Sequence, residues 1–511
     1  MASAVQSGRK RFARWFGRVV LALLALYIVL LIPESEPPQP KGAGKEPFRW
    51  NRDAFWKELE TRLREARGLT PEERLARFDA AFEKVQSALN RVAETRLPPD
   101  APEFDTLEAA FFDLAPVAAV CPERLPNLHA AAGRMRHLVK WQSEQWPGTE
   151  EARRRLYRLL YGSRAAVEEV LLQVPPTTNA LEGADSYDHQ QTPSAEMLGL
   201  KIHSGDILVS RGGAATSALI ARGNDYPGNF SHIALVHVDE QTRKVSVIES
   251  HIESGVSVRP IEPYLAETKL RIMVLRLRGN LPAMVADPLL PHRAASRALS
   301  NSLARHIPYD FAMEHSDPSK QFCSEVATAA YQPLGITLWT HLSQLSTRGV
   351  TSWLAALGVR NFESQEPSDL EYDPQLRVVA EWRDPDALLK DHVDNAVIDV
   401  MLERAERGEK LSYNRWMLPV ARLAKAWSVL LNCFGKVGPI PEGMSATVAL
   451  RADKLTQDHG DLTAWLNPQV QAFRTQHGYT PPYWELVRMA REAQQGLVMR
   501  RRLGMQAPAS P

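Results

Sequence analysis

Three residues in the middle of the chain have the types and the order that nucleophilic catalysis by a thiol requires. Cys323 directly precedes an apolar helical pattern, and the positive end of a helix dipole favours the thiolate form of cysteine. His232 begins one apolar run and Glu249 ends the next. A hairpin turning near Glu240 would place His232 opposite Glu249 on the same face of a sheet. An imidazole backed by a carboxylate can take a proton from a thiol and return it to the leaving group.

Each of these residues also has an ordinary structural interpretation. A lone cysteine is often a small apolar core residue, and a histidine at the end of a strand is often part of the packing. Glu253 is a second acidic residue that could orient His232 in place of Glu249. Residue types and spacing alone therefore leave the catalytic and the structural interpretation open.

The order of six short motifs resembles the YiiX/YaeF-like permuted branch of the NlpC-type, papain-like cysteine hydrolases. The resemblance covers about residues 199–345. It implies an α+β, circularly permuted papain-like domain in which Cys323 is the nucleophile, His232 is the general base and then acid, and Glu249 orients His232. In chain order the matching pieces are Gly205–Leu208, Ser231–Ala234, Ile248–Ser250 with Gly255–Val256, Pro308–Phe311, Asp317 and Phe322–Val326.

The same resemblance suggests how an oxyanion and a substrate would be held. The backbone N–H of Cys323 would be one oxyanion donor. Phe322 stands where the family often has tyrosine, so a hydroxyl is missing there. Tyr309 could replace it, although it could equally pack within its own turn, and Ser231 is a further candidate for oxyanion or substrate binding. Asp206 is interpreted as a structural turn residue.

The rest of the chain consists of elements that flank this segment. Apolar residues at helical spacing, preceded by the helix-start signal at Thr70 and Pro71, predict a helical region on the amino-terminal side. A second helical region follows the α+β segment. The expected units are a helical region at 49–174, the permuted papain-like domain at 199–360, a helical region at 386–504, linkers at 33–48 and 175–198, a connector at 361–385 and a tail at 505–511.

The amino terminus has the pattern of a membrane anchor. Residues 1–14 form a basic tail, and residues 15–32 are almost wholly apolar apart from Arg18. The excess of basic residues before the apolar run predicts a cytoplasmic amino terminus and a catalytic domain in the periplasm, held at a bacterial inner membrane. A cleaved signal peptide and a buried apolar helix are the two alternatives.

Composition excludes several classes of protein. Hydrophobic residues make up 44% of the 511 residues and charged ones 24%, which is incompatible with wholesale disorder. The net charge of +1 gives no general field for nucleic acid. Three cysteines cannot build a disulfide scaffold, and Cys121 and Cys433 are expected to be free rather than paired.

Alternative chemistries have weaker support. Four histidines of the α+β segment suggest zinc, but they lack a zinc motif, and two of them five residues apart on a strand point to opposite faces. The sequence therefore predicts neither a metal nor a cofactor. It also has no G-x-S-x-G elbow for a serine hydrolase. The zinc candidates are His203, His232, His237 and His251.

The predicted function is a membrane-anchored envelope cysteine hydrolase or acyltransferase. The family resemblance implies an acyl or amide substrate, such as a cell-wall peptide, an N-acyl compound or a lipid ester. The Gly-rich segment 210–230 is either a mobile rim of the cleft or a plain surface loop. A non-catalytic envelope adaptor, built on a retired hydrolase domain, is the alternative.

Overall fold

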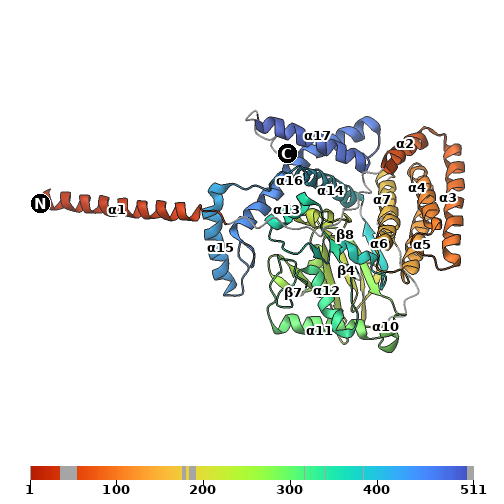
Figure 1. Ribbon diagram of the computed structural model, residues 1–511, viewed down its shortest axis with the longest axis horizontal. Coiled ribbons are helices and arrows are strands. Elements are labelled where there is room, and N and C mark those ends of the chain that lie inside the picture. The colour runs from red at the N-terminus through yellow and green to blue at the C-terminus, as the bar shows by residue number, and fades with distance from the viewer. Residues whose placement is uncertain are drawn as a thin grey trace.

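A computed structural model describes residues 2–34, 54–174, 180–182, 191–315, 317–339, 341–383 and 385–502. It shows a central sheet with helices around it (Figure 1). The amino-terminal helices lie on one side of this sheet, and the carboxyl-terminal helices lie along another. The first helix, α1 (Ala2–Leu30), projects away from the rest of the molecule.

The central sheet has seven antiparallel strands in the order β1-β11-β8-β4-β5-β6-β7. Its four central runs, β4, β5, β6 and β8, coincide with apolar runs that the sequence predicts as strands. Strands β1 and β11, at the edge opposite β7, were not predicted, because they come from segments interpreted as a linker and a connector. The bounds are β1 Ala180–Glu182, β4 Ile207–Gly212, β5 His232–Val238, β6 Val245–His251, β7 Gly255–Pro260, β8 Lys269–Leu277 and β11 Leu376–Arg383.

The β5–β6 hairpin has the predicted turn but a different register. The Asp239 side chain accepts hydrogen bonds from the backbone N–H groups of Gln241 and Thr242, at 3.1 and 2.7 Å, and this holds the turn together. Glu249 pairs with Ala234 rather than with His232. Because side chains alternate along a strand, His232 still shares the face of Glu249, but as its diagonal neighbour.

Different elements cover the two faces of the sheet. Helices α11 (Leu290–Ala304) and α12 (Cys323–Tyr331) pack on the face that carries Ile233 and Leu235. The other face, which carries Ala234, is covered by a small hairpin and by helix α9. The covering elements are β2 Ser194–Met197, β3 Leu200–His203 and α9 Ile261–Ala266. The short helix α10 spans Pro282–Ala286 and is not one of them.

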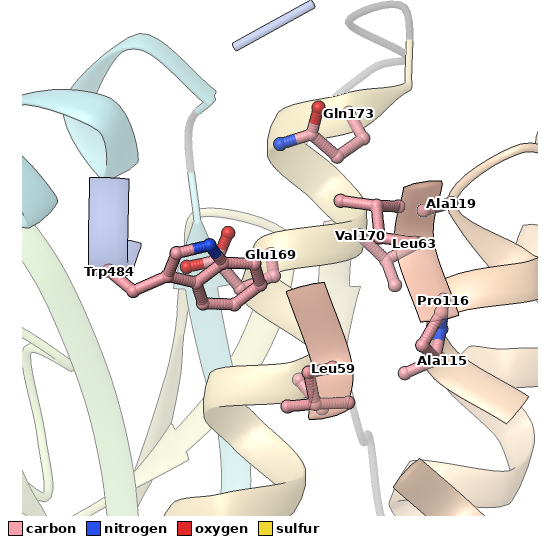
Figure 2. A pocket seen from close by; sticks show the side chains of 10 residues that line it. Leu59, Leu63, Ala115, Pro116, Ala119, Glu169, Val170, Gln173 and Trp484 are labelled. Atoms are coloured by element: carbon pink, nitrogen blue, oxygen red, sulfur yellow. The ribbon is translucent and has the colours of Figure 1, made fainter. Parts of the chain in front are cut away.

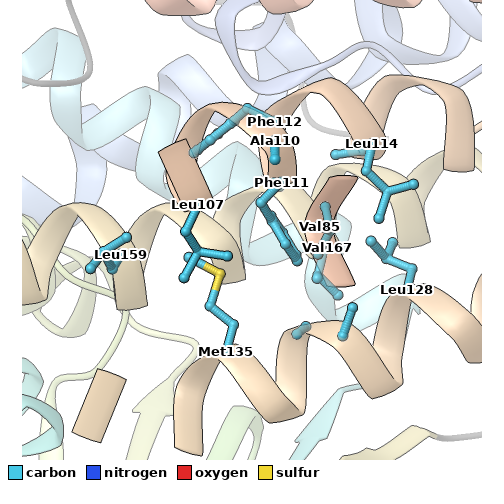
Figure 3. Close-up of a cluster of buried hydrophobic side chains, with 14 of the residues drawn as sticks. Val85, Leu107, Ala110, Phe111, Phe112, Leu114, Leu128, Met135, Leu159 and Val167 are labelled. Carbon is cyan, nitrogen blue, oxygen red and sulfur yellow. The ribbon is translucent and has the colours of Figure 1, made fainter. Parts of the chain in front are cut away.

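The amino-terminal helices form a core of their own (Figure 3). Its centre contains Phe111, Leu114 and Met135, which are fully buried. The predicted start of α3 is confirmed, because Thr70 and Glu73 form a reciprocal capping box with Pro71 at the first helical position. The helices are α2 Ala54–Gly68, α3 Pro71–Glu94, α4 Pro102–Ala118, α5 Leu125–Ser143, α6 Glu150–Leu156 and α7 Gly162–Gln173.

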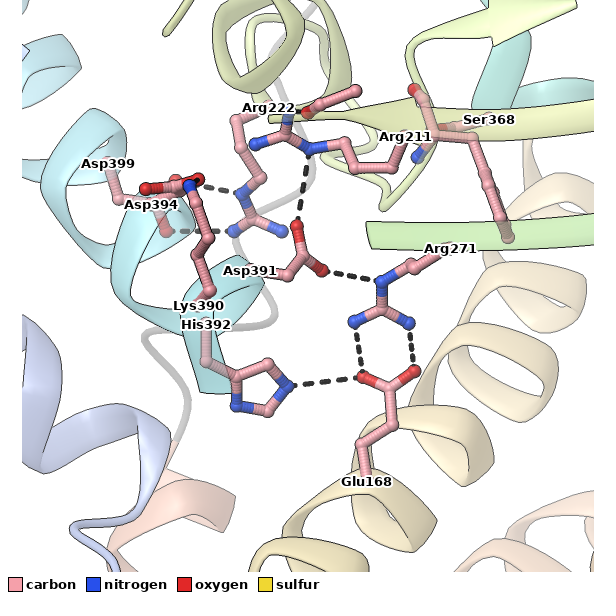
Figure 4. Close-up of polar contacts among 12 residues, drawn as sticks. Glu168, Arg211, Arg222, Arg271, Ser368, Lys390, Asp391, His392, Asp394 and Asp399 are labelled. Carbon is pink, nitrogen blue, oxygen red and sulfur yellow. Dashed lines mark hydrogen bonds and ion pairs between the residues drawn. The ribbon is translucent and has the colours of Figure 1, made fainter. Parts of the chain in front are cut away.

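A network of buried charges joins both helical regions to the sheet (Figure 4). Arg271 on β8 pairs with Glu168 of α7 and with Asp391 of α14. Asp391 also forms an ion pair with Arg211 on β4, at 3.2 Å. The remaining helices are α8 Ala215–Arg222, α13 Arg348–Ala356, α14 Pro385–Glu406, α15 Leu418–Asn432, α16 Ala446–His477 and α17 Tyr483–Arg502, and the short strands β9 Ser343–Gln344 and β10 Glu363–Ser364 pair with each other.

In the part of the chain that the structure describes, no helix combines the length and the apolar character needed to cross a membrane. The transmembrane helix predicted over residues 15–32 is therefore not supported. The uncharged part of α1 begins only after Arg18 and ends with the helix at Leu30. That stretch is shorter than the roughly 20 apolar residues that a crossing requires.

Other predictions are corrected or lie outside the described residues. Segment 210–230 contains helix α8, in line with the interpretation as a loop around one helical turn, but most of it is buried rather than on the surface, and Arg222 forms a bidentate pair with Asp399. All three cysteines are free, with Cys121 buried and Cys433 exposed. The connector 361–385 supplies strand β11. Residues 35–48, 175–179, 183–190 and 505–511, which belong to predicted linkers and the tail, are outside the described part.

Candidate functional site

Cys323 is the first residue of helix α12, and three hydrogen bonds fix the chain that leads into it. The Glu325 carboxylate accepts from the backbone N–H of Phe322 at 2.8 Å. The N–H of Gln321 donates to the carbonyl of Pro308 at 3.0 Å, and the carbonyl of Gln321 accepts from the Ser250 hydroxyl at 2.6 Å. Ser250 follows Glu249 on β6, so the segment that carries the thiol is fastened next to the predicted orienting residue.

The thiol of Cys323 is buried, with 6% of the residue exposed. It lies beside the backbone N–H of Ile233, the neighbour of His232, and this N–H lowers the pKa of the thiol. Burial has the larger effect and, together with the carboxylate of Glu366, raises the pKa to about 12. The loss of hydration on burial therefore opposes the helix amino terminus, which favours the thiolate.

His232 and Glu249 are in direct contact. Nε2 of His232 lies 2.7 Å from Oε2 of Glu249, whose side chain is fully buried. Burial lowers the pKa of His232, and the hydrogen bond and charge of Glu249 oppose that effect. Because Nε2 faces the carboxylate, Nδ1 is the ring nitrogen available to a thiol. Among the described residues, no hydrogen bond joins His232 to Cys323.

Glu249 has two further partners that the sequence analysis missed. Arg259 on β7 donates to its Oε1 from Nε and Nη2, at 3.0 and 2.6 Å, and His251 lies 3.1 Å away. Burial raises the pKa of Glu249, but the hydrogen bonds and charges of His232 and His251 outweigh it and hold the pKa well below its usual value. Strand alternation would have found Arg259, since Ser257 pairs with Glu249 and Arg259 lies two residues further on the same face.

The zinc alternative has a partial counterpart in this cluster. The ligand atoms of His232, Glu249 and His251 lie within 4.8 Å of one another, whereas His203 and His237 are not in the group. The guanidinium of Arg259 already bonds the carboxylate and lies 2.7 Å from Nε2 of His251. A second cation there would meet a fixed positive charge, so these residues fit a metal poorly.

Glu366 is a buried carboxyl near the thiol that the sequence analysis also missed. Burial, followed by the charge of Asp369, raises the pKa of Glu366 to about 8. Its neighbours are firmly attached: Thr328 of α12 donates to Gln365 at 2.8 Å, and Ser368 bonds the backbone N–H and carbonyl of Phe230 at 2.9 Å. Glu366 is thus held between the helix of Cys323 and the chain leading to His232.

Tyr309 is placed next to the candidate nucleophile. Burial and then Cys323 raise the pKa of Tyr309 well above its usual value. Gly255 allows this arrangement, since a Cβ there would stand 2.1 Å from the Ile307 carbonyl, which accepts from Val256 at 2.9 Å. The Tyr309 ring also packs edge-on against Phe311, at 5.0 Å between centroids.

The two remaining sequence-selected residues are buried. Ser231 donates its backbone N–H to the carbonyl of Ser210 at 2.9 Å, and its hydroxyl has no hydrogen-bond partner among the residues that the structure describes. Asp206 accepts from Arg276 through both oxygens, at 2.7 and 2.8 Å, and from the backbone N–H of His203 at 2.8 Å. These bonds agree with the interpretation of Asp206 as a structural residue.

A cleft of about 400 Å³ opens beside Tyr309. Its walls come from the Tyr309–Ala312 turn, from α13 and from the start of α16, and Glu34 and Lys320 also contribute. A second hollow lies among α2, α4, α7 and α17, between Leu59 and Trp484 (Figure 2). With about 30 Å³ it has room for little more than a water molecule, so the cleft at Tyr309 is the better candidate for a substrate.

Comparison with known proteins supports one assignment. No curated protein and no solved structure matches the chain. Residues 201–380, which contain Cys323, His232 and Glu249, do match a family model. That family is described as permuted papain-like amidase enzyme, YaeF/YiiX, C92 family, so the resemblance predicted from the order of the motifs is confirmed for this segment.

Proposed function

We propose that the protein is a cysteine hydrolase that cleaves an amide or ester bond through a thioester intermediate. The observation that carries the proposal is the 2.7 Å contact between His232 and Glu249, with the thiol of Cys323 held beside the next residue of the same strand. The match of residues 201–380 to a papain-like amidase family supports the same chemistry.

The reaction begins from a neutral thiol and a neutral imidazole, because burial disfavours both charged forms. As the sulfur attacks the carbonyl carbon, its proton passes to Nδ1 of His232, and Glu249 stabilises the imidazolium. The imidazolium then protonates the leaving amine or alcohol as its bond to carbon breaks. Water, deprotonated by His232, attacks the thioester and releases the acid and the thiol. Within the described part of the chain, no hydrogen bond joins the thiol to the imidazole, and Ile233, whose N–H lies beside the thiol, faces the other side of the strand from His232. The proposal therefore requires the side chain of His232 to approach Cys323 when substrate binds.

The developing oxyanion needs donors. The backbone N–H of Cys323 at the start of α12 is one, as expected for a free N–H at a helix amino terminus. The hydroxyl of Tyr309 is proposed as the second, because Tyr309 lies next to Cys323 and lines the cleft. Ser231 is assigned to support of the strand start instead, since it is buried and its backbone bonds Ser210.

The substrate class is proposed from the family and from the cleft. An acyl compound fits best, such as an N-acyl amide, a lipid ester or a cell-wall peptide, with its acyl group at Cys323 and the rest in the cleft of about 400 Å³. An acceptor other than water would make the enzyme an acyltransferase by the same steps. The location at a bacterial inner membrane, with the catalytic domain in the periplasm, stays a prediction from the charges around residues 15–32.

A thiol-reactive acyl probe tests the proposal by intact and peptide mass spectrometry. Because Cys433 is exposed, the experiment uses the Cys433→Ser protein, so that unselective labelling does not mask the site. We expect one label on Cys323, slowed at least tenfold in His232→Ala and absent in Cys323→Ala. Label on buried Cys121 instead, or an equal rate in His232→Ala, would refute the assignment.

Turnover distinguishes the enzyme from the non-catalytic adaptor. A labelled enzyme should release the acyl group as acid, or transfer it to an added amine or alcohol, with first-order kinetics. If Cys323 is acylated once and the thioester is never released for any acyl group in a panel, the adaptor interpretation is preferred. The chelator EDTA should leave the labelling rate unchanged, because Arg259 occupies the position that a metal would need.

A further inference from the structure

Helix α15 carries an exposed apolar stripe. Six large apolar residues are 47–72% exposed and recur at alternating spacings of four and three, which is the period of one helix face. The stripe begins in the 3-10 turn before α15 and ends just after the helix. Its members are Trp416, Val420, Leu423, Trp427, Leu430 and Phe434.

The opposite face of α15 is fixed to the molecule, so the stripe has a defined orientation. Leu418 and Ala421 are buried in a small core with Ile440 and Ala446. The returning chain packs closely on the helix: the backbone N–H of Ile440 donates to the Ser428 hydroxyl at 2.9 Å, and a Cβ on Gly438 would lie 2.4 Å from Ser428. The stripe therefore faces away from this small core.

The charges within residues 410–441 have one sign. This segment contains five basic residues and no aspartate or glutamate, and Glu442, which follows it, interacts with Lys425. A helix with a large apolar face that includes tryptophan, flanked by lysine and arginine, is typical of segments that lie in the interface of an anionic bilayer. The basic residues are Lys410, Arg415, Arg422, Lys425 and Lys436.

The stripe is continuous with a second exposed apolar surface. Arg422 donates to the backbone carbonyls of Leu30 and Ile32, at 2.9 and 2.8 Å, and the Tyr27 hydroxyl donates to Trp416 at 3.3 Å. The end of α1 is thus attached to α15, and the apolar side chains of α1 from Trp15 onward are exposed. Figure 1 shows α15 on the side of the molecule from which α1 projects.

We propose that residues 415–437 bind the surface of an anionic lipid bilayer, with the stripe of α15 lying in the boundary between headgroups and acyl chains. The apolar side chains enter this boundary while the basic residues meet the lipid phosphates. Binding of this kind needs no helix that crosses the bilayer. The proposal does not depend on the proposed hydrolase activity.

Co-sedimentation of the full chain with vesicles tests it. One set contains phosphatidylcholine alone. The other contains phosphatidylcholine with about 30% phosphatidylglycerol, which supplies anionic headgroups. We expect at least tenfold tighter binding to the anionic vesicles. The double variant Leu423→Glu, Trp427→Glu should bind the anionic vesicles at least tenfold more weakly than the wild type. The control is Leu303→Glu on α11. Leu303 is an exposed leucine outside the stripe, with 72% of it accessible, so this variant should bind as the wild type does.

Further measurements keep the test decisive. Arg415→Gln with Lys436→Gln should reduce the preference for anionic vesicles, and high salt should do the same. The proposal would be overturned if the wild type did not bind the vesicles. It would also be overturned if the double variant bound them as tightly as the wild type, and the attachment would then be assigned to α1 alone. A wild type that is dimeric in light scattering, with a monomeric double variant and no vesicle binding, would also overturn it in favour of a second copy of the chain.

Discussion

Replacing Glu249 with glutamine tests the geometry of the site most directly. The amide keeps the size of the side chain but removes the charge that faces His232 at 2.7 Å. The pKa of His232, already lowered by burial, should fall further, because the imidazolium loses its carboxylate. A charge-assisted hydrogen bond contributes about 1.5–3 kcal/mol. At 1.36 kcal/mol for each factor of ten, thiol attack should slow about 10- to 150-fold.

The same substitution should cost little stability. Breaking a fully buried ion pair commonly costs about 3–5 kcal/mol. The Arg259 side chain, however, is 30% exposed and keeps Glu267 as a partner at 2.7 Å. Water and Glu267 can therefore replace much of what the guanidinium loses. We expect a loss of about 1–2 kcal/mol in the free energy of unfolding, which leaves the rate effect measurable on folded protein.

The assay is the second-order rate constant for acylation of Cys323, followed by intact mass in the Cys433→Ser background. Glu253→Gln is the matched control, because Glu253 is an exposed acidic residue close to the same strand and the sequence leaves it open as the orienting group. Its rate should equal that of the parent protein. Acylation of Glu249→Gln at the parent rate, or an equal slowing by Glu253→Gln, would refute the reasoning.

Three further substitutions probe the surroundings of the site. Glu366→Gln removes a carboxyl that raises the pKa of Cys323, so the pH at which iodoacetamide labelling accelerates should move lower; an unchanged rate–pH profile would contradict this. Tyr309→Phe should slow turnover of an acyl substrate about 100-fold if its hydroxyl binds the oxyanion. Unaltered turnover would leave Tyr309 as a packing residue. Arg271→Met takes from buried Glu168 its bidentate partner and from Asp391 one of its two arginines, so it should lower the free energy of unfolding by about 3–5 kcal/mol in urea denaturation. A loss below about 1 kcal/mol would argue against the network.

The central strands and the proximity of His232 and Glu249 could be predicted because their signals are local. Apolar runs bounded by turn residues give β5 and β6, and alternation then places His232 and Glu249 on the same face. The exact register was wrong by two residues, since it depends on how the turn closes at Asp239. That offset turns a facing pair into a diagonal one without separating the side chains.

Other features of the site depend on contacts between distant segments. Glu366 follows Cys323 by more than 40 residues in a stretch with no periodic pattern, and its place depends on bonds from Thr328 and Ser368. Strand β11 was missed for a similar reason, because the turn-rich segment before it resembles a connector. The helix amino terminus at Cys323 can be recognised in sequence, whereas the depth of burial, which raises the pKa of the thiol, cannot.

The buried charges also explain why the flanking helices should not be treated as detachable from the hydrolase domain. Arg271 and Arg211 extend from the central strands into the buried interior, where an unpaired guanidinium charge would be strongly disfavoured. Their counter-charges come from α7 on one side and α14 on the other, through Glu168 and Asp391. Removing the amino-terminal helices would take Glu168 from Arg271, and removing α14 would take Asp391 from both arginines, inside the sheet that positions the site. The helical regions and the catalytic segment consequently form one folding unit, although the family match covers only residues 201–380.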